Sequence, residues 1–222
     1  MNILIFTDSR GEHKLTFKKK LIFTEKLKKN LELLGHSIVL MTCPFKWTTT
    51  FDFIEICENK LININNFDKV ILYTGIVEYS PRYLDDALHK IYNNNNNEIV
   101  TLKKLLIPPN KKKSRIINKK YKIMDKLIGK DIIFNYLNTP FIIKYNNKNT
   151  INLLSKDMLK NNIIPWLKDN INEKLIYINS NHIVKNWEGN YIKKNPLGRP
   201  KNISIISEYS KIIKDNIKNV ID

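Results

Sequence analysis

The sequence predicts a three-layer, doubly wound α/β fold, in which helices cover both faces of a mostly parallel sheet of four or five strands. Short apolar runs rich in β-branched residues recur along the chain, as buried strands do. Segments with apolar residues at helical spacing separate these runs. Because ligands of such sheets bind outside the carboxyl ends of the strands, we expect function in the loops that follow them.

Three apolar runs in the first part of the chain predict buried strands: Asn2–Thr7, His36–Thr42 and Asp68–Thr74. Helical spacing over Phe17–Leu34 and Phe51–Leu61 predicts the helices between them, and Gly35 stands where a C-terminal glycine belongs. Proline is tolerated in a first helical turn, so Pro81 predicts a third helix that runs to Tyr92.

The middle of the chain is less regular. The asparagine run Asn93–Asn97 and the PPNKKK segment at 108–113 predict surface excursions. Strand-like apolar residues in Asp131–Lys144, broken by Asn138-Thr139-Pro140, predict a β-hairpin insertion.

The last third returns to the α/β pattern. Asn152–Asp169 predicts a helix that Pro165 kinks or divides, and Lys174–Asn179 predicts a fourth parallel strand. The polar, turn-rich segment Asn181–Asn202 predicts a long loop, and Ile203–Val220 predicts a closing amphipathic helix.

The length of 222 residues predicts one domain over 1–222, with an insertion or irregular region at about 93–150. Lys and Arg number 38 against 21 Asp and Glu, a formal net charge of +17. Only four of these basic residues are Arg, and an excess of Lys, Asn and Ile is what AT-rich codons supply. The charge would still assist non-specific contact with phosphate polymers.

Several classes of protein are excluded by what the sequence lacks. No apolar run approaches the ~20 residues of a membrane-spanning helix, and Met1–Thr7 is too short for a secretory signal. Cys43 and Cys57 are too few for a disulfide framework, so we expect a reduced, cytoplasmic setting. With no glycine-rich phosphate loop and no metal-ligand spacing, we expect no cofactor and no metal.

The strongest local motif is TDSRG at Thr7–Gly11, where the first strand ends. A serine there can point its hydroxyl into a crevice, and the backbone N–H groups that follow can stabilise an oxyanion. Asp8 or Ser9 could instead simply cap the next helix. Both interpretations stay open on this motif alone.

TDSRG resembles the nucleophile block of the SGNH (GDSL-type) hydrolases, with Thr7 where they usually have Gly. ILYTGIVE at Ile71–Glu78 resembles their third-strand block, a strand followed by Gly-x-Asn-Asp, and Gly198–Asn202 is similar in position to their Asp-x-x-His block. The resemblance spans most of the chain and implies an SGNH/flavodoxin-like fold. It also implies Ser9 as nucleophile, with the N–H groups of Ser9 and Gly75 holding the oxyanion.

The chain departs from this pattern at two positions. Val77 stands where the oxyanion-hole Asn would be, and Arg199 stands near the expected His, although Arg cannot act as a base. GIVEYSPR at Gly75–Arg82 and NWEGNY at Asn186–Tyr191 resemble strings of a divergent SGNH-like group linked to surface-polysaccharide synthesis. In that group these departures would be normal features.

A serine nucleophile needs a base at neutral pH. Of the four histidines, His182 follows the fourth strand most closely and is the best candidate, with His13 second. A loop His is more often structural, and we expect His36 and His89 to be so. Glu78 could orient a base or act as one, or could be an ordinary solvated Glu.

Arginines and aromatic residues predict how a substrate could be held. Three of the four arginines fall on the proposed strand-end loops: Arg10, Arg82 and Arg199. Their planar forks suit a carboxylate or phosphate, although they could equally brace loops. Asp8, Asn186 and Trp187 complete the predicted substrate-binding set, and exposed aromatics such as Trp187 and Tyr79 could stack on sugar rings.

Three functions therefore compete. The first is an SGNH-like serine hydrolase or acyltransferase that removes or transfers an acyl group on a carbohydrate or sugar conjugate. The second is a non-catalytic relative that binds a carbohydrate or nucleotide-sugar. The third is a basic nucleic-acid-binding protein, suggested by the net charge and the Lys-rich stretch Lys103–Lys122.

Overall fold

The computed structural model describes the following residues: 1–8, 22–42, 50–75, 79, 82–83, 143–145, 148–151, 154–179 and 205–222. The chain divides into two compact units. Unit 1 comprises Met1–Glu78, Ile163–Asn181 and Ser210–Asp222, and unit 2 comprises Tyr79–Asn162 and His182–Tyr209.

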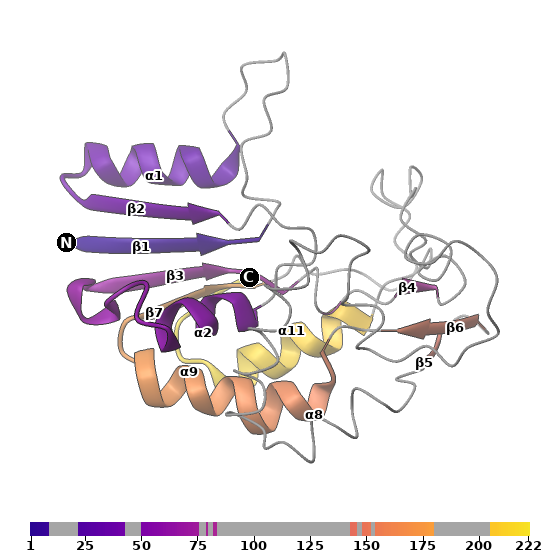
Figure 1. Ribbon diagram of the computed structural model, residues 1–222. Coiled ribbons are helices and arrows are strands. Elements are labelled where there is room, and N and C mark those ends of the chain that lie inside the picture. The colour runs from indigo at the N-terminus through magenta and orange to yellow at the C-terminus, as the bar shows by residue number, and fades with distance from the viewer. Residues whose placement is uncertain are drawn as a thin grey trace, which may run out of the picture. The chain divides into compact units, whose positions relative to one another are not determined.

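Unit 1 contains a five-stranded sheet in the order β2-β1-β3-β7-β8, and all of its neighbouring strands run parallel (Figure 1). Its strands are β1 (Asn2–Thr7), β2 (Ser37–Thr42), β3 (Lys69–Tyr73), β7 (Leu175–Ile178) and β8 (Val220–Ile221). The predicted α/β class with a parallel sheet is confirmed. The strand order reverses at β1, which pairs with β2 on one side and β3 on the other, so the carboxyl end of β1 is a topological switch point.

The fifth strand lies where the sequence predicted the end of a helix. The closing helix α11 spans Ile205–Asn216 and β8 follows it, so the prediction of a helix as far as Val220 is wrong at its end. The backbone N–H groups of Tyr177 and Asn179, in and just after β7, donate to carbonyls of this closing segment at 2.9 and 2.8 Å. Helical periodicity does not reveal such a short strand, because its position is set by the open edge of β7.

Helix α1 (Phe23–Leu33) covers one face of the sheet. Leu27 and Leu31 on this helix pack against a cluster that includes Ile3 and Ile5 of β1. Side chains alternate between the faces of a strand, so the odd-numbered residues of β1 define this face. The first helical turns predicted for Phe17–Leu34 fall largely outside the described residues.

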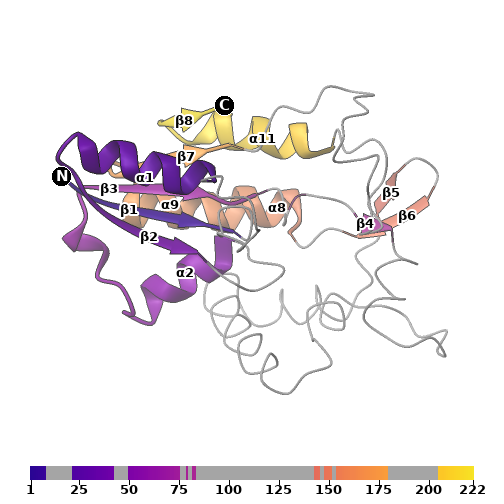
Figure 2. The ribbon, with the colours of Figure 1, turned by 90° about the horizontal axis from the view of Figure 1, so that it is seen from above.

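Helices α2 (Thr50–Glu58) and α9 (Ile164–Ile171) cover the opposite face. The rings of Phe6 in β1 and Phe53 in α2 lie 5.4 Å apart, and Phe53 meets Trp166 of α9 edge-on at 6.2 Å. Seen from above in Figure 2, α1 and α2 lie on opposite sides of the strands. Unit 1 therefore has the three layers that the sequence predicts.

The helical segment predicted for Asn152–Asp169 is divided just before Pro165, as expected. It consists of α8 (Lys156–Met158), a π-helical turn at Leu159–Ile163 and then α9, with Pro165 in the first turn of α9. Proline lacks an N–H and crowds the carbonyl four residues before it. A wider π turn at this point accommodates both effects.

A three-stranded antiparallel sheet in unit 2 has the order β4-β6-β5, with β4 at Arg82–Tyr83, β5 at Ile143–Tyr145 and β6 at Lys148–Ile151. The predicted helix from Pro81 to Tyr92 is wrong at Arg82–Tyr83, because this dipeptide pairs with β6. The hairpin predicted over Asp131–Lys144, with its break at 138–140, falls almost entirely outside the described residues, and the hairpin that the structure describes is formed by β5 and β6. The pairing of β4 with β6 joins segments that are far apart in the sequence, which local patterns do not encode.

Two stacked tyrosines lie in the core of unit 2. The rings of Tyr79 and Tyr209 are 4.6 Å apart and nearly parallel, and the Tyr209 hydroxyl donates to the Leu154 carbonyl at 2.7 Å. Both side chains are fully buried. The expectation that Tyr79 stacks on a sugar as an exposed aromatic is therefore wrong.

Across the described residues, none of the helices has both the length and the apolar character needed to cross a membrane.

Candidate active site at the carboxyl edge of the sheet

The site begins where β1 and β3 end side by side. Thr7 pairs with Tyr73 in the parallel register. One residue further on, the Asp8 N–H donates to the Tyr73 carbonyl at 3.2 Å. The backbone that leads into Ser9 is thus hydrogen-bonded to the backbone that leads into Gly75.

Polar residues are buried at this edge. Thr7 and Asp8 are both 0% exposed, and the Thr7 hydroxyl donates to the Asp8 carbonyl at 3.2 Å. Burying a polar or charged group costs free energy unless it is hydrogen-bonded, so packing alone would favour apolar residues here. Asp8 is thus a buried acidic residue at the end of β1, directly before the predicted nucleophile Ser9.

Gly75 ends the β3 segment in a conformation that favours glycine. Its φ is 111°, in the region that side chains with a Cβ rarely adopt, and it is buried. A positive φ at this point turns the chain after Gly75 away from the course of an extended strand. The oxyanion role of Gly75 remains a prediction.

Three buried hydroxyl groups meet at Thr74, the residue that directly precedes Gly75. The Thr74 hydroxyl lies 3.0 Å from that of Thr50, the first residue of α2, and 3.3 Å from that of Tyr177 in β7. Each of these residues is at most 1% exposed. One helix and two strands are therefore joined by hydroxyl contacts at the end of β3.

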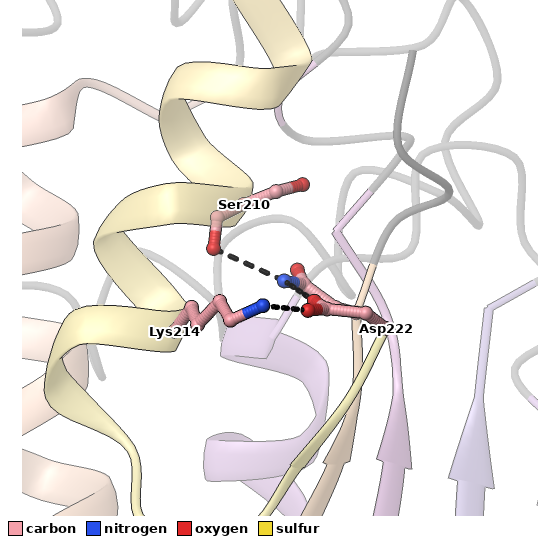
Figure 3. A network of polar contacts seen from close by, with 4 residues as sticks. Ser210, Lys214 and Asp222 are labelled. Carbon is pink, nitrogen blue, oxygen red and sulfur yellow. Dashed lines mark hydrogen bonds and ion pairs between the residues drawn. The ribbon is translucent and has the colours of Figure 1, made fainter.

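Asn179 plays a similar part at the end of β7. Its side-chain amide donates to the Ser210 carbonyl in α11 and to an Asp222 carboxylate oxygen, both at 3.0 Å, and it is 2% exposed. Asp222 also forms an ion pair with Lys214 of α11 (Figure 3). The hydrogen bond to Asp222 raises the pKa of Lys214 above its usual value. This network holds the end of β7 against α11 and the closing residue of the chain.

Most of the predicted site residues lie outside the described part of the chain. Asp8 and Gly75 are described and lie at the neighbouring ends of β1 and β3. Arg82 lies in β4 of unit 2, where only its backbone is described. The others fall outside: Ser9, Arg10, Glu78, His182, Asn186, Trp187 and Arg199. Their roles, and the convergence of the arginines, remain predictions.

Sequence reasoning missed three residues of this edge: Thr50, Tyr177 and Asn179. A polar residue directly after a buried strand was the available signal for Asn179. Thr50 and Tyr177 gave none, because their hydroxyls meet only through the pairing of distant segments.

A hollow lies away from this edge, in unit 1. Its volume is about 550 Å³, and Cys57, Glu58 and Trp166 are among the residues that line it. The Trp166 indole N–H donates to the Glu58 carboxylate at 3.0 Å. Burial, and secondarily the charge of Glu58, raises the pKa of the Cys57 thiol to about 12. The thiol therefore stays protonated and is a poor nucleophile.

No family model matches the sequence, and no curated protein matches it. The structure is similar to a crystal structure of the lipase/acylhydrolase from Enterococcus faecalis, with 15% sequence identity and a TM-score of 0.43, covering 100% of this chain and 75% of that one.

Proposed function

We propose that this protein is a divergent SGNH-like serine hydrolase or acyltransferase that acts on a carbohydrate or sugar conjugate, with Ser9 as nucleophile. The Ser9 hydroxyl attacks the acyl carbon, and the N–H groups of Ser9 and Gly75 stabilise the oxyanion that forms. Resemblance to a group linked to surface-polysaccharide synthesis suggests the sugar substrate.

The observation that carries the proposal is the hydrogen bond between the Asp8 N–H and the Tyr73 carbonyl. It joins the backbone one residue before Ser9 to the backbone two residues before Gly75. An oxyanion site needs a nucleophile and N–H donors around one reacting atom. Neighbouring parallel strands that end together supply such a meeting point for two loops.

The proton transfers require a base other than the usual one, because Arg199 stays protonated. We assign this role to His182, with His13 as second candidate and Glu78 to orient the base. The base takes the proton of the Ser9 hydroxyl as Oγ bonds to the acyl carbon, and returns it to the sugar oxygen that leaves. Water, or the hydroxyl of an acceptor sugar, then attacks the acyl carbon and gives its proton to the base, which passes a proton to Ser9 Oγ as the Oγ–acyl bond breaks.

Substrate contacts are assigned to Asp8, Arg10, Arg82, Asn186, Trp187 and Arg199. Guanidinium groups bind carboxylates or phosphates through two parallel hydrogen bonds. A sugar acid or a phosphate-bearing sugar is therefore the substrate class that the arginines favour.

A fluorophosphonate probe tests the proposal, because it labels only activated serines. We expect the wild-type chain to be labelled and Ser9→Ala to lose the label. Ser37→Ala is the matched control, since Ser37 is exposed at the start of β2, at the opposite edge of the sheet. Labelling that persists in Ser9→Ala would exclude Ser9 as the nucleophile.

The alternative is a non-catalytic carbohydrate- or nucleotide-sugar-binding protein with the same cleft. Val77 in place of an Asn donor and the lack of a His near Arg199 favour it. No labelling of the wild type, together with measurable binding of an anionic oligosaccharide, would establish this alternative. Tight binding of single- or double-stranded nucleic acid at physiological salt would instead support the third function.

A further inference from the structure

We infer that the hydroxyl chain of Thr50, Thr74 and Tyr177 positions the Gly75 N–H, so that these three residues are positioning residues of the oxyanion site. The inference rests on the proposed function, because it assigns a purpose to the Gly75 N–H. The three hydroxyls are joined in series, at 3.0 Å between Thr50 and Thr74 and 3.3 Å between Thr74 and Tyr177.

The topology brings these hydroxyls together on one face of the sheet. Tyr177 lies beside Leu72 in the register of β3 and β7, and Thr74 follows Leu72 by two residues. The side chains of Tyr177 and Thr74 therefore point to the same face of the sheet as that of Leu72. The same face carries α2, whose first residue is Thr50. The chain of contacts thus spans three elements that are each fixed by the core.

Thr74 acts on Gly75 through a single peptide group. The N–H of Gly75 belongs to the peptide that begins at the Thr74 carbonyl carbon, so the orientation of Thr74 sets one end of that plane. Glycine is the residue with the greatest backbone freedom, and the φ of Gly75 is 111°. A donor on so free a backbone needs an external restraint, because oxyanion donors act only when they are held in place beforehand.

Packing alone does not account for three hydroxyls in this place. Each side chain is at most 1% exposed, and Val or Phe would fill nearly the same volume as Thr or Tyr without burying a polar atom. A hydrogen-bonded hydroxyl adds a direction that an apolar contact lacks. The chain of hydroxyls therefore fixes the rotation of Thr74 as well as its position.

The test compares Thr74→Val and Tyr177→Phe with Thr24→Val, which makes the same change at a buried threonine of α1. Hydrolysis of p-nitrophenyl acetate gives kcat and KM, and NMR relaxation gives the order parameter of the Gly75 N–H. We expect kcat to fall on the order of 10-fold in Thr74→Val, with a smaller loss in Tyr177→Phe and KM little changed. We expect the order parameter to fall from about 0.85 toward 0.6.

Rescue separates positioning from general destabilisation. Thr74→Ser keeps the hydroxyl, so we expect it to restore most of kcat and the Gly75 order parameter, whereas Thr24→Val should change neither. An unchanged order parameter in Thr74→Val, or equal losses in Thr74→Val and Thr24→Val, would overturn the inference. If the wild type neither labels nor turns over while the order parameter still falls in Thr74→Val, the proposed function fails and the positioning of the Gly75 N–H stands.

Discussion

The two edges of the parallel sheet differ in whether their polar groups are exposed or buried. At the amino edge, where the strands begin, polar groups meet in water: the Asn2 N–H donates to Asp68 at 2.7 Å and the Lys69 ammonium to the Glu173 carbonyl at 3.0 Å, both exposed. Apolar side chains near this edge are exposed as well, including Leu33 at 77% and Leu61 at 69%.

At the carboxyl edge the polar groups are inside. Thr7, Asp8, Thr74 and Asn179 end or follow three neighbouring strands, and none is more than 2% exposed. Exposed polar contacts contribute little to folding and are easily replaced. Buried polar groups cost free energy unless they are hydrogen-bonded. Once hydrogen-bonded, they hold the surrounding backbone in one geometry. The contrast supports our proposal that function lies at the carboxyl edge.

The largest expected effect comes from substituting one glycine at each edge and comparing the losses of unfolding free energy. Gly75 and Gly35 both have positive φ, 111° and 80°. A Cβ on Gly35 would meet nothing within 4 Å, whereas Gly75 is buried. We expect Gly35→Ala to cost about 1 kcal/mol of unfolding free energy through strain, and Gly75→Ala roughly 1–3 kcal/mol more through overpacking.

Denaturant unfolding of the two variants measures these costs, and fluorophosphonate labelling of Ser9 measures function. Only Gly75→Ala should lose labelling. Equal costs and equal labelling would show that the two edges do not differ in the way that burial indicates.

A second comparison uses one asparagine from the buried edge and one from the surface. Asn179 makes two buried or part-buried hydrogen bonds, whereas Asn59 donates to the Glu55 carbonyl from an exposed position. We expect Asn179→Ala to cost about 1–3 kcal/mol of unfolding free energy and Asn59→Ala roughly 0.5 kcal/mol or less. Chemical unfolding checks both values, and a larger loss at Asn59 would contradict the contrast.

Cys57 tests whether reactive groups are confined to the carboxyl edge, because it lines the hollow of unit 1 that lies away from this edge. With its pKa raised to about 12, we expect the thiol at pH 8 to react with a disulfide reagent on the order of 10³-fold more slowly than an unfolded thiol. A Cys43→Ser background isolates the signal. Fast reaction of Cys57 would reveal an activated nucleophile away from the carboxyl edge.

The same pKa has a consequence for stability. The folded value lies above the usual value of 9.0, so the contribution of the buried neutral thiol is fully present below pH 9 and is lost as the pH rises toward 12. We expect unfolding free energy to fall with pH in this window, and to fall less in Cys57→Ser. Parallel slopes for the two chains would contradict the burial of the thiol.

The smallest expected effect concerns Lys214. This lysine is exposed, and its ion pair with Asp222 is screened by water. We expect Lys214→Met to destabilise the chain less than Asn179→Ala does, and the difference from wild type to shrink at high salt. The raised pKa places any loss of this pairing at alkaline pH, above the usual lysine range. A loss at neutral pH as large as that of Asn179→Ala would show that the network depends on the charge.

Much of the fold could be predicted because local sequence patterns determine where most of its strands and helices lie. Apolar runs fixed β1, β2, β3 and β7 to within one residue, and Pro165 marked the division before α9. The strand at Arg82–Tyr83 and the short β8 could not be found in this way, since each exists only by pairing with a segment far along the chain.

The site was less predictable for the same reason. The sequence directed attention to the ends of β1 and β3, and the structure describes Asp8 and Gly75 there. The hydroxyls of Thr50 and Tyr177 converge on Thr74 from residues 24 and 103 positions away. No motif links such residues, because a hydrogen bond between side chains leaves no spacing rule in the sequence.

The stacked pair of Tyr79 and Tyr209 gives unit 2 its own optical reporter. Two nearly parallel rings at 4.6 Å couple their transitions and contribute to near-ultraviolet circular dichroism only while they remain stacked. Trp166, packed against Phe53, reports on unit 1 by fluorescence in a chain whose other tryptophans, Trp47 and Trp187, are replaced by Phe. Such a chain offers one signal for each unit, and the coincidence or separation of the two signals on heating shows whether the units unfold as one cooperative body.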